Sequence, residues 1–190
     1  LGSLSRNGVE GFARHNFAGG CYSMINHTRV DGDSVVKLPA KPNPDWWVAK
    51  FFRDLTGVDV LDLRPMEGGG SEFLQSFAFG GKRDLRENSL GATLMFVNTG
   101  NEDIEIEMPV YEDDVFSHNL LYPRREFKLT APKGDLRSDT WLLNGEELIW
   151  DGTLHTPEGF VVDDNNWEEE KFIVPALGIM FVELINATVY

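Results

Sequence analysis

Residues 43–57 read NPDWWVAKFFRDLTG and decide how this chain is organised. Asn43 is a favoured N-cap residue, and Pro44 suits the first position of a helix. Apolar side chains then recur at helical spacing: Trp47, Val48, Phe51, Phe52 and Leu55. The stretch therefore predicts an amphipathic helix from about residue 44 to residue 56, ended by Thr56-Gly57.

Downstream of this helix, the pattern changes to short strands. Apolar and acidic residues alternate over 103–108, and residues 91–97 are nearly continuously apolar, as in a central strand. Further strands are expected at 127–131, at 140–143 and 148–150 on either side of an Asn144-Gly145 turn, and at 173–185 with a break near Pro175. Many short strands separated by turns predict a β-sandwich or small barrel over residues 58–190.

Upstream of the helix, the signals are fewer. Residues 1–8 look like the tail of a helix that ends at Gly8, and 9–18 look like a short buried strand. A largely polar loop is expected from there to Pro42. One strand and one helix cannot cover both of their faces, so residues 1–57 are expected to dock on something outside the sandwich.

The composition restricts the class of protein. Hydrophobic residues make up 42% of the 190 residues, which favours a folded chain. The net charge of −14 repels polyanions, so nucleic acid is not an expected partner. No apolar run reaches the roughly 18 residues of a membrane span, so membrane association is expected only through other segments. Basic clusters at 82–86 and 124–128 are expected on solvated strand ends, with a polyanion site as the alternative.

The order of these features resembles a known family. Residues 14–26, RHNFAGGCYSMIN, are similar to the last barrel strand of heparanases and above all of plant heparanase-like proteins, which carry Arg-Gln, Gly-Gly-Asn-Tyr and Leu-Leu-Asn there. Residues 42–47, PNPDWW, resemble the family's Pro-Asn-Pro-Asp-Tyr-Tyr, which opens its last barrel helix. Further similar stretches follow in order: 55–61 (LTGVDVL), 125–130 (REFKLT), 142–145 (LLNG) and 175–182. The ordered set, rather than any one stretch, carries the resemblance to heparanase-like proteins of glycoside hydrolase family 79.

The resemblance implies a fold and an activity. The fold is mainly β: residues 1–57 would be the last strand–helix unit of a (β/α)₈ barrel, and 58–190 a C-terminal β-sandwich. The activity would be that of a retaining β-glucuronidase, endo or exo, acting on glycans that contain glucuronic acid. Such enzymes use two glutamates about 5 Å apart. In the family both lie on earlier barrel strands, which places them upstream of Leu1. No catalytic residue is therefore expected in this chain, which by itself should be inactive.

The resemblance also implies substrate-binding residues. Active sites of such barrels lie at the carboxyl ends of the strands, where Gly19, Gly20 and Tyr22 would follow the last strand. In the family, the matching glycine and tyrosine contact the uronic acid, and we place this role chiefly on Gly20 and Tyr22. His15 stands where the family has Gln and is expected either near the substrate or in the core. The alternative for the glycines and Tyr22 is a structural turn with a packed ring.

Other residue patterns bear on the cell compartment and on cofactors. Cys21 is the only cysteine, so no disulfide can form within the chain. Sequons at Asn26 and Asn186 would carry glycans on a secretory route, which suggests an extracellular or lysosome- or vacuole-like compartment. No metal or other cofactor is expected, because the histidines lack ligand spacing. The five tryptophans are expected mostly in the core or at interfaces, with Trp167 as the candidate for exposure.

Two other functions remain open. The replacement of Gln by His15 and of Asn by Cys21 would suit a catalytically inactive heparanase-like protein that serves as a structural or glycan-binding part of an extracellular assembly. Alternatively, residues 58–190 would be a free-standing carbohydrate-binding module, although such a sandwich has no need of the helix at 44–56. The expected partners are a glucuronic-acid-containing glycan and the remainder of the barrel, in the same precursor or in a separate chain.

Overall fold

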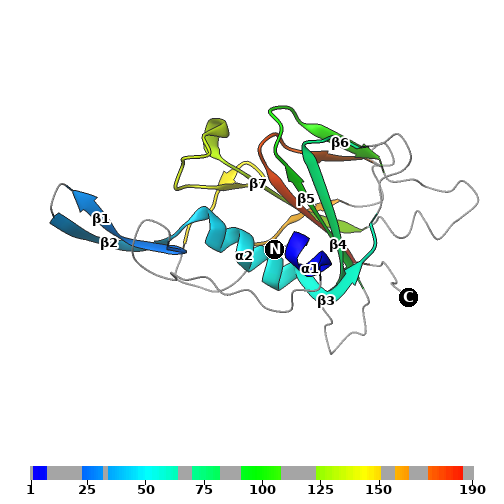
Figure 1. Cartoon of the computed structure of the whole chain (residues 1–190), viewed down its shortest axis with the longest axis horizontal. Coiled ribbons are helices and arrows are strands. Elements are labelled where there is room, and N and C mark those ends of the chain that lie inside the picture. The colour runs from blue at the N-terminus through cyan, green and yellow to red at the C-terminus, as the bar shows by residue number, and fades with distance from the viewer. Residues whose placement is uncertain are drawn as a thin grey trace, which may run out of the picture.

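A computed structural model of the chain describes residues 2–7, 23–31, 34–63, 70–81, 91–107, 123–150, 157–162 and 171–185. The described part is mainly β, which confirms the predicted fold class (Figure 1). Its elements are α1 Gly2–Arg6, β1 Ile25–Asp31, β2 Ser34–Pro42, α2 Pro44–Leu55, β3 Thr56–Leu61, β4 Leu74–Gly81, β5 Ala92–Asn98, β6 Ile104–Glu107, β7 Arg124–Thr130, the 3₁₀ turn η1 Pro132–Gly134, β8 Leu142–Leu143, β9 Glu146–Glu147, β10 Phe160–Val162, β11 Lys171–Val174 and β12 Ile179–Leu184.

One large antiparallel sheet organises the described residues. Its strand order is β3-β4-β5-β12-β7-β8-β9, and β10 also pairs with β7. The predicted central strand is β5, which is buried along almost its whole length between β4 and β12. The predicted break near Pro175 separates β11 from β12, so that β12 can cross back and pair with both β5 and β7. The long apolar runs thus lie at the middle of the sheet, where both faces are covered.

On one face the large sheet packs against a second, two-stranded sheet made of β6 and β11. The alternation predicted over 103–108 appears in β6, where Ile104 and Ile106 are half-buried and the glutamates between and after them are exposed. Phe172 and Val174 of β11 are fully buried against the large sheet. Two facing sheets with a shared apolar layer form the expected sandwich.

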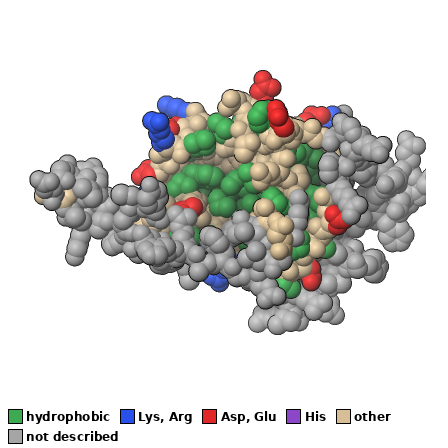
Figure 2. Space-filling view, in the orientation of Figure 1, with side chains coloured by type: hydrophobic (Ala, Val, Ile, Leu, Met, Phe, Trp, Pro, Cys, Tyr) green, Lys and Arg blue, Asp and Glu red, His purple; other side chains and the backbone are tan. Residues whose placement is uncertain are grey.

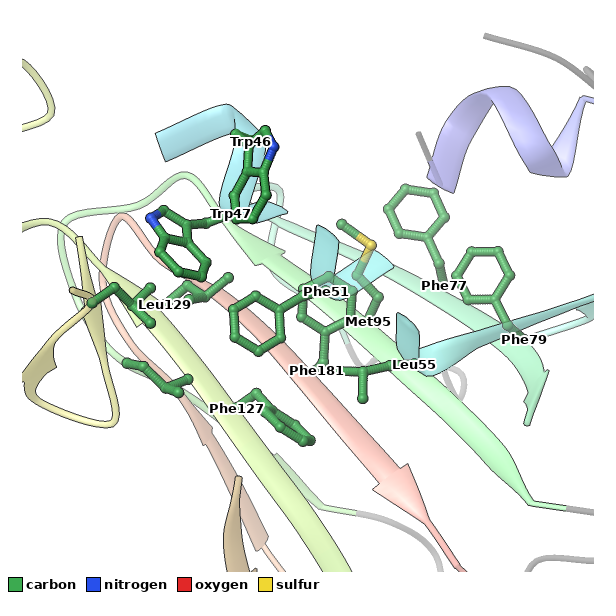
Figure 3. Close-up of a cluster of buried hydrophobic side chains, with 12 residues drawn as sticks. Trp46, Trp47, Phe51, Leu55, Phe77, Phe79, Met95, Phe127, Leu129 and Phe181 are labelled. Carbon is green, nitrogen blue, oxygen red and sulfur yellow. The ribbon is translucent and has the colours of Figure 1, made fainter. Parts of the chain in front are cut away.

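The opposite face of the large sheet is covered by α2. Trp47 and Phe51 lie in one buried cluster with Phe127 and Phe181 of the sheet (Figure 3). The expectation that this helix docks on something outside the sandwich is therefore wrong for Trp47 and Phe51. Aromatic side chains on β7 and β12 cover the apolar face of α2. The period of a strand shows which of its residues share a face, but not which element packs on that face. Phe17, in the short buried strand expected at 9–18, lies outside the described residues. The predicted domain boundary at residue 57 stays a prediction.

The predicted hairpin turn at Asn144-Gly145 joins β8 to β9. Both residues have positive φ, 51° at Asn144 and 88° at Gly145. Positive φ at both central residues is the backbone twist that a two-residue hairpin requires, and Asn-Gly tolerates it best. The turn prediction is confirmed.

The largely polar loop expected before Pro42 is in fact a second hairpin. β1 and β2 pair antiparallel, from Ile25 opposite Pro42 to Asp31 opposite Ser34. Figure 1 shows this hairpin as an arm that extends away from the sheets. The Asp31-Gly32 pair is a hairpin signal in the sequence, and Val36, Leu38 and Ala40 of β2 alternate with more polar residues or proline. The proline inside β2 and the lack of such alternation in β1 obscure this signal.

An exposed ion cluster links the two strands of the small sheet and predicts a pH effect. Lys171 Nζ lies 2.6 Å from Glu105 Oε1 and 3.1 Å from Glu107 Oε1, and its hydrogen bonds to both glutamates raise the Lys171 pKa above the ordinary 10.5. A group whose pKa is raised by folding stabilises the fold fully at pH values below its unfolded-state pKa. This contribution is lost as the pH rises through the folded-state pKa. The stability difference between the wild type and Lys171→Gln is therefore expected to disappear above pH 10.5. Thermal melts across alkaline pH test this, and the difference should be absent at every pH in a Glu105→Gln, Glu107→Gln background.

Candidate functional site

The predicted sugar-binding residues His15, Gly19, Gly20 and Tyr22 lie outside the described residues, as does Cys21. Their roles therefore stay predictions. Of the two sequons, Asn26 lies on β1 and Asn186 lies outside the described part. The structure does describe the segment that directly follows Tyr22, from Ser23 onward.

The position of the catalytic glutamates is a further prediction that the structure leaves untested. The family resemblance places both of them upstream of Leu1, and Leu1 itself lies outside the described residues. The expectation that this chain holds no catalytic residue therefore stays a prediction. No glutamate of the described part is assigned to the acid/base or to the nucleophile.

The segment after Tyr22 is fixed to the first turn of α2. The Asn43 backbone N–H donates to the Met24 carbonyl at 2.8 Å, and the Asn43 side-chain amide donates to the Ser23 carbonyl. Ser23 is buried, and its hydroxyl donates to the Ile25 carbonyl at 2.8 Å. Asn43 occupies the predicted N-cap position, but its side chain makes no capping bond to the helix. It holds the main chain at Ser23 instead.

The first turn of α2 is in turn joined to the loop around β8. The indole rings of Trp46 and Trp150 meet edge to face, with centroids 5.1 Å apart. Lys41, at the end of β2, donates to the Thr140 hydroxyl at 3.0 Å and lies 3.4 Å from Asp139. Aromatic pairs of this geometry add to the burial of the rings themselves. Ser23 and Met24, which follow the predicted binding residues in the sequence, are therefore joined through α2 to the sandwich.

A second candidate is a groove on the small-sheet side of the large sheet. Three side chains of β7 form its floor: Glu126, Lys128 and Thr130. Asn144, Phe160 and Pro175 stand around them, and the hollow has a volume of about 340 Å³. We call it the β7 groove. Its volume is at the lower end of the range for small-molecule sites, so it suits a small ligand rather than a long chain.

Buried charges lie beneath this groove. Arg124 is 1% exposed, its Nε lies 2.8 Å from Glu126 Oε1, and its guanidinium stacks 4.7 Å from the ring centre of Phe172. Glu126 Oε2 lies 3.0 Å from Lys128 Nζ. The expectation that the basic cluster at 124–128 lies on a solvated strand end is wrong for Arg124. Alternation with the core residues Phe127 and Leu129 places Arg124 on the opposite face of β7, and the small sheet covers Arg124 on that face.

Asn144 closes the groove at the strand edge. Its side-chain oxygen accepts from the Lys128 backbone N–H at 2.8 Å, and its side-chain NH₂ donates to the Glu126 carbonyl at 3.0 Å. These bonds replace part of a strand ladder in the gap between β8 and β10, both of which pair with β7. The amide thereby satisfies main-chain groups that would otherwise need solvent. Asn144 thus shapes the groove wall.

Metal and membrane sites can be assessed only within the described part of the chain. There, no group of three His, Cys, Asp or Glu side chains is placed to hold a metal ion. No helix among the described residues has the length and apolar character to cross a membrane. The acidic pairs Asp113-Asp114 and Asp163-Asp164, whose carboxylates could attract Ca²⁺ or lie in solvated loops, fall outside it, as does Trp167. Of the other tryptophans, Trp46 and Trp47 are in the core as expected, with Trp141 and Trp150 packed against it.

The chain is distantly similar to proteins named as glycosidases or as heparanase-like. It is 24% identical over 208 residues to heparanase-like protein 3 of Arabidopsis thaliana, an alignment that covers 100% of this chain and 35% of that protein. It is 25% identical over 151 residues to the hyaluronoglucuronidase of Hirudo nipponia, covering 78% of this chain and 27% of that protein. The chain thus spans about a third or less of the length of these relatives. No protein-family model matches it. These similarities support a distant relationship to heparanase-like glycoside hydrolases.

Proposed function

We propose that this chain is the C-terminal portion of a retaining β-glucuronidase of the heparanase-like type, in glycoside hydrolase family 79. The observation that carries the proposal is collinearity: family-like stretches run in order from residue 14 to residue 182, and one relative aligns along the whole chain. In this proposal residues 1–57 complete the barrel, and the sandwich supports it. The two catalytic glutamates belong to the part of the parent protein that would precede Leu1.

Within this proposal the chain forms one side of the uronate subsite. Gly20 would let its backbone N–H approach the sugar carboxylate, and the Tyr22 hydroxyl would donate a hydrogen bond to it. The anchoring of Ser23 and Met24 by Asn43 supports this role, because a fixed neighbour reduces the disorder that binding must remove. The chain would position the sugar while glutamates elsewhere in the parent break the bond.

The partner in this proposal is the remainder of the barrel. Exposed apolar side chains on β3 and just before β4 support an uncovered contact surface: Val58, Val60 and Phe73. Figure 2 shows hydrophobic side chains gathered in the middle of one face of the molecule. Apolar surface of this kind is typical of sites that another structure covers.

Charge guides the proposed substrate class. A chain with a net charge of −14 repels densely sulfated glycans, so a glucuronic-acid-containing glycan with little sulfate fits it better.

We also propose a secreted or lysosome- or vacuole-like location, in which Asn26 and Asn186 would carry glycans. Removal of N-glycans should then increase the mobility of the native protein on a gel.

The uronate role predicts a selective kinetic defect in Tyr22→Phe. In the full-length protein, we expect kcat/KM for an aryl β-glucuronide to fall about tenfold or more, since one hydrogen bond to a charged group contributes roughly 1.5–3 kcal/mol. The matched aryl β-glucoside lacks the carboxylate, so its kcat/KM should stay within about twofold. Release of the fluorescent aglycone measures both rates.

Other outcomes would separate the alternatives. Equal losses on glucuronide and glucoside would contradict the uronate contact. A full-length protein that hydrolyses neither substrate but binds glucuronic-acid oligosaccharides would contradict the enzyme proposal and favour the catalytically inactive glycan-binding protein. The 190-residue chain alone should hydrolyse nothing, since the catalytic glutamates are proposed to lie elsewhere.

A further inference from the structure

Asn144 and Gly145 form a chemically labile pair at the tip of the β8–β9 hairpin. The side-chain amide of an asparagine is open to attack by the next main-chain nitrogen, and glycine hinders this attack least because it has no Cβ. We propose that Asn144 is a deamidation site, at which the native hairpin suppresses the reaction and opening of the hairpin from β7 releases it. The reaction involves neither sugar nor catalytic glutamate, so it is independent of the proposed function.

The reaction needs only this chain and water. The Gly145 nitrogen gives up its proton and attacks the side-chain carbonyl carbon of Asn144. A new C–N bond forms, the C–N bond to the NH₂ group breaks, and ammonia leaves. Water then opens the resulting cyclic succinimide at either of its carbonyl groups. Opening at one carbonyl gives aspartate, and opening at the other gives isoaspartate, in which the main chain contains an extra carbon.

Hydrogen bonds, rather than burial, protect Asn144 in the native fold. Asn144 and Gly145 are both exposed to solvent. The Asn144 carboxamide is held on both sides: its oxygen accepts from the Lys128 N–H at 2.8 Å, and its NH₂, the leaving group of the reaction, donates to the Glu126 carbonyl at 3.0 Å. Rotation of the carboxamide toward the Gly145 nitrogen breaks both bonds. The native hairpin therefore slows the reaction at a residue that water already reaches.

The attachment of the hairpin to the sheet is small. Strands β8 and β9 have two residues each, and β8 pairs with β7 through Leu142 and Leu143. Apart from this pairing, the side chains of Leu143 and Leu148 hold the hairpin in the buried cluster beneath α2. An element at the edge of a sheet with so short a ladder opens at a lower free energy than the central strands do. Each opening frees the Asn144 amide to react.

The products cannot restore the native attachment. Aspartate has an oxygen in place of the NH₂ group, so a carboxylate oxygen would face the Glu126 carbonyl oxygen with no hydrogen between them. Isoaspartate lengthens the main chain inside a two-residue turn, where Leu143 must stay opposite Glu146. Chemical modification of the open form makes opening irreversible. Deamidation thereby turns a transient opening of the hairpin into a permanent one.

Hydrogen exchange tests this consequence. In protein that has reacted at Asn144, the amide hydrogens of residues 142–148 should exchange about tenfold faster than in fresh protein, because the hairpin no longer closes on β7. Those of β5 should not change, because that strand is paired on both sides. Equal exchange of the hairpin in reacted and fresh protein would contradict the loss of attachment.

The rate of deamidation tests the proposal itself. The 190-residue chain is incubated in buffer and in guanidinium chloride, and peptide mapping by mass spectrometry distinguishes Asn144 from Asn7, the other asparagine that a glycine follows. We expect Asn144 to react about tenfold or more slowly in buffer. Leu148→Val, which loosens the buried anchor of the hairpin, should speed the reaction in buffer about threefold or more, whereas Leu136→Val, at a side chain 61% exposed, should not. Equal rates in buffer and denaturant, or a rate insensitive to Leu148→Val, would overturn the proposal.

Discussion

Replacing Phe51 with alanine is expected to lower the free energy of unfolding by about 3–5 kcal/mol, the range for truncating a buried phenylalanine. Phe51 is fully buried, and its ring lies 5.6 Å from that of Phe127 and 6.2 Å from that of Phe181, centre to centre. Alanine would leave a cavity between α2 and two adjacent strands of the sheet. Neither strand can move to fill it, because β12 is paired on both sides.

Urea unfolding of the 190-residue chain, followed by tryptophan fluorescence, measures this effect. The control is Phe73→Ala, since Phe73 is 48% exposed and its loss should cost less than about 1 kcal/mol. If Phe51→Ala cost no more than the control, α2 would not be packed on this sheet in solution. The helix would then dock elsewhere, as the sequence alone suggested.

The helix α2 links the segment that follows Tyr22 to the sandwich. Its first residues hold the segment after Tyr22, and its apolar face fixes it to the sandwich. At its other end the buried Thr93 hydroxyl of β5 donates to the Leu55 carbonyl at 2.7 Å, and β3 begins at the next residue. A shift of the sandwich would therefore be transmitted through α2 to Ser23 and Met24.

The helix and the central strands could be predicted because their side chains carry a clear period. Pro44 and the apolar spacing defined α2, and the run at 91–97 defined β5. The Asn144-Gly145 turn followed from backbone chemistry alone. Such local signals identify elements but not the faces on which they pack. The packing of α2 on the large sheet therefore could not be predicted from them.

Other features have no local signal. Strand β1 has only Ile25 and Val30 as apolar residues, and β10 is a three-residue strand with Phe160 and Val161 exposed, so neither shows an apolar period. Burial of Arg124 depends on Phe172, which is far away in the sequence and reaches it only through the small sheet. The β7 groove depends on the same long-range arrangement. Its residues could not be grouped before the strand order was known.

Replacing Glu126 with alanine is expected to lower the free energy of unfolding by about 3–5 kcal/mol, because it breaks the buried ion pair between this carboxylate and the Arg124 guanidinium. The matched control is Glu183→Ala in the same sheet. Glu183 pairs with Arg125 on the opposite face, where Arg125 is partly exposed, so its loss should cost about 1 kcal/mol or less.

A double variant tests the cause of that loss. Arg124→Met combined with Glu126→Leu removes both buried charges while keeping the side-chain volume, so most of the stability lost in Glu126→Ala should return. Methionine can also keep the contact with the Phe172 ring that the guanidinium makes. Urea unfolding of the three variants gives the comparison. Recovery of stability in the double variant would mean that the loss in Glu126→Ala comes from the buried charge left behind rather than from lost packing. A double variant as unstable as Glu126→Ala would contradict this, because the ion pair itself would then be needed for packing β11 on β7.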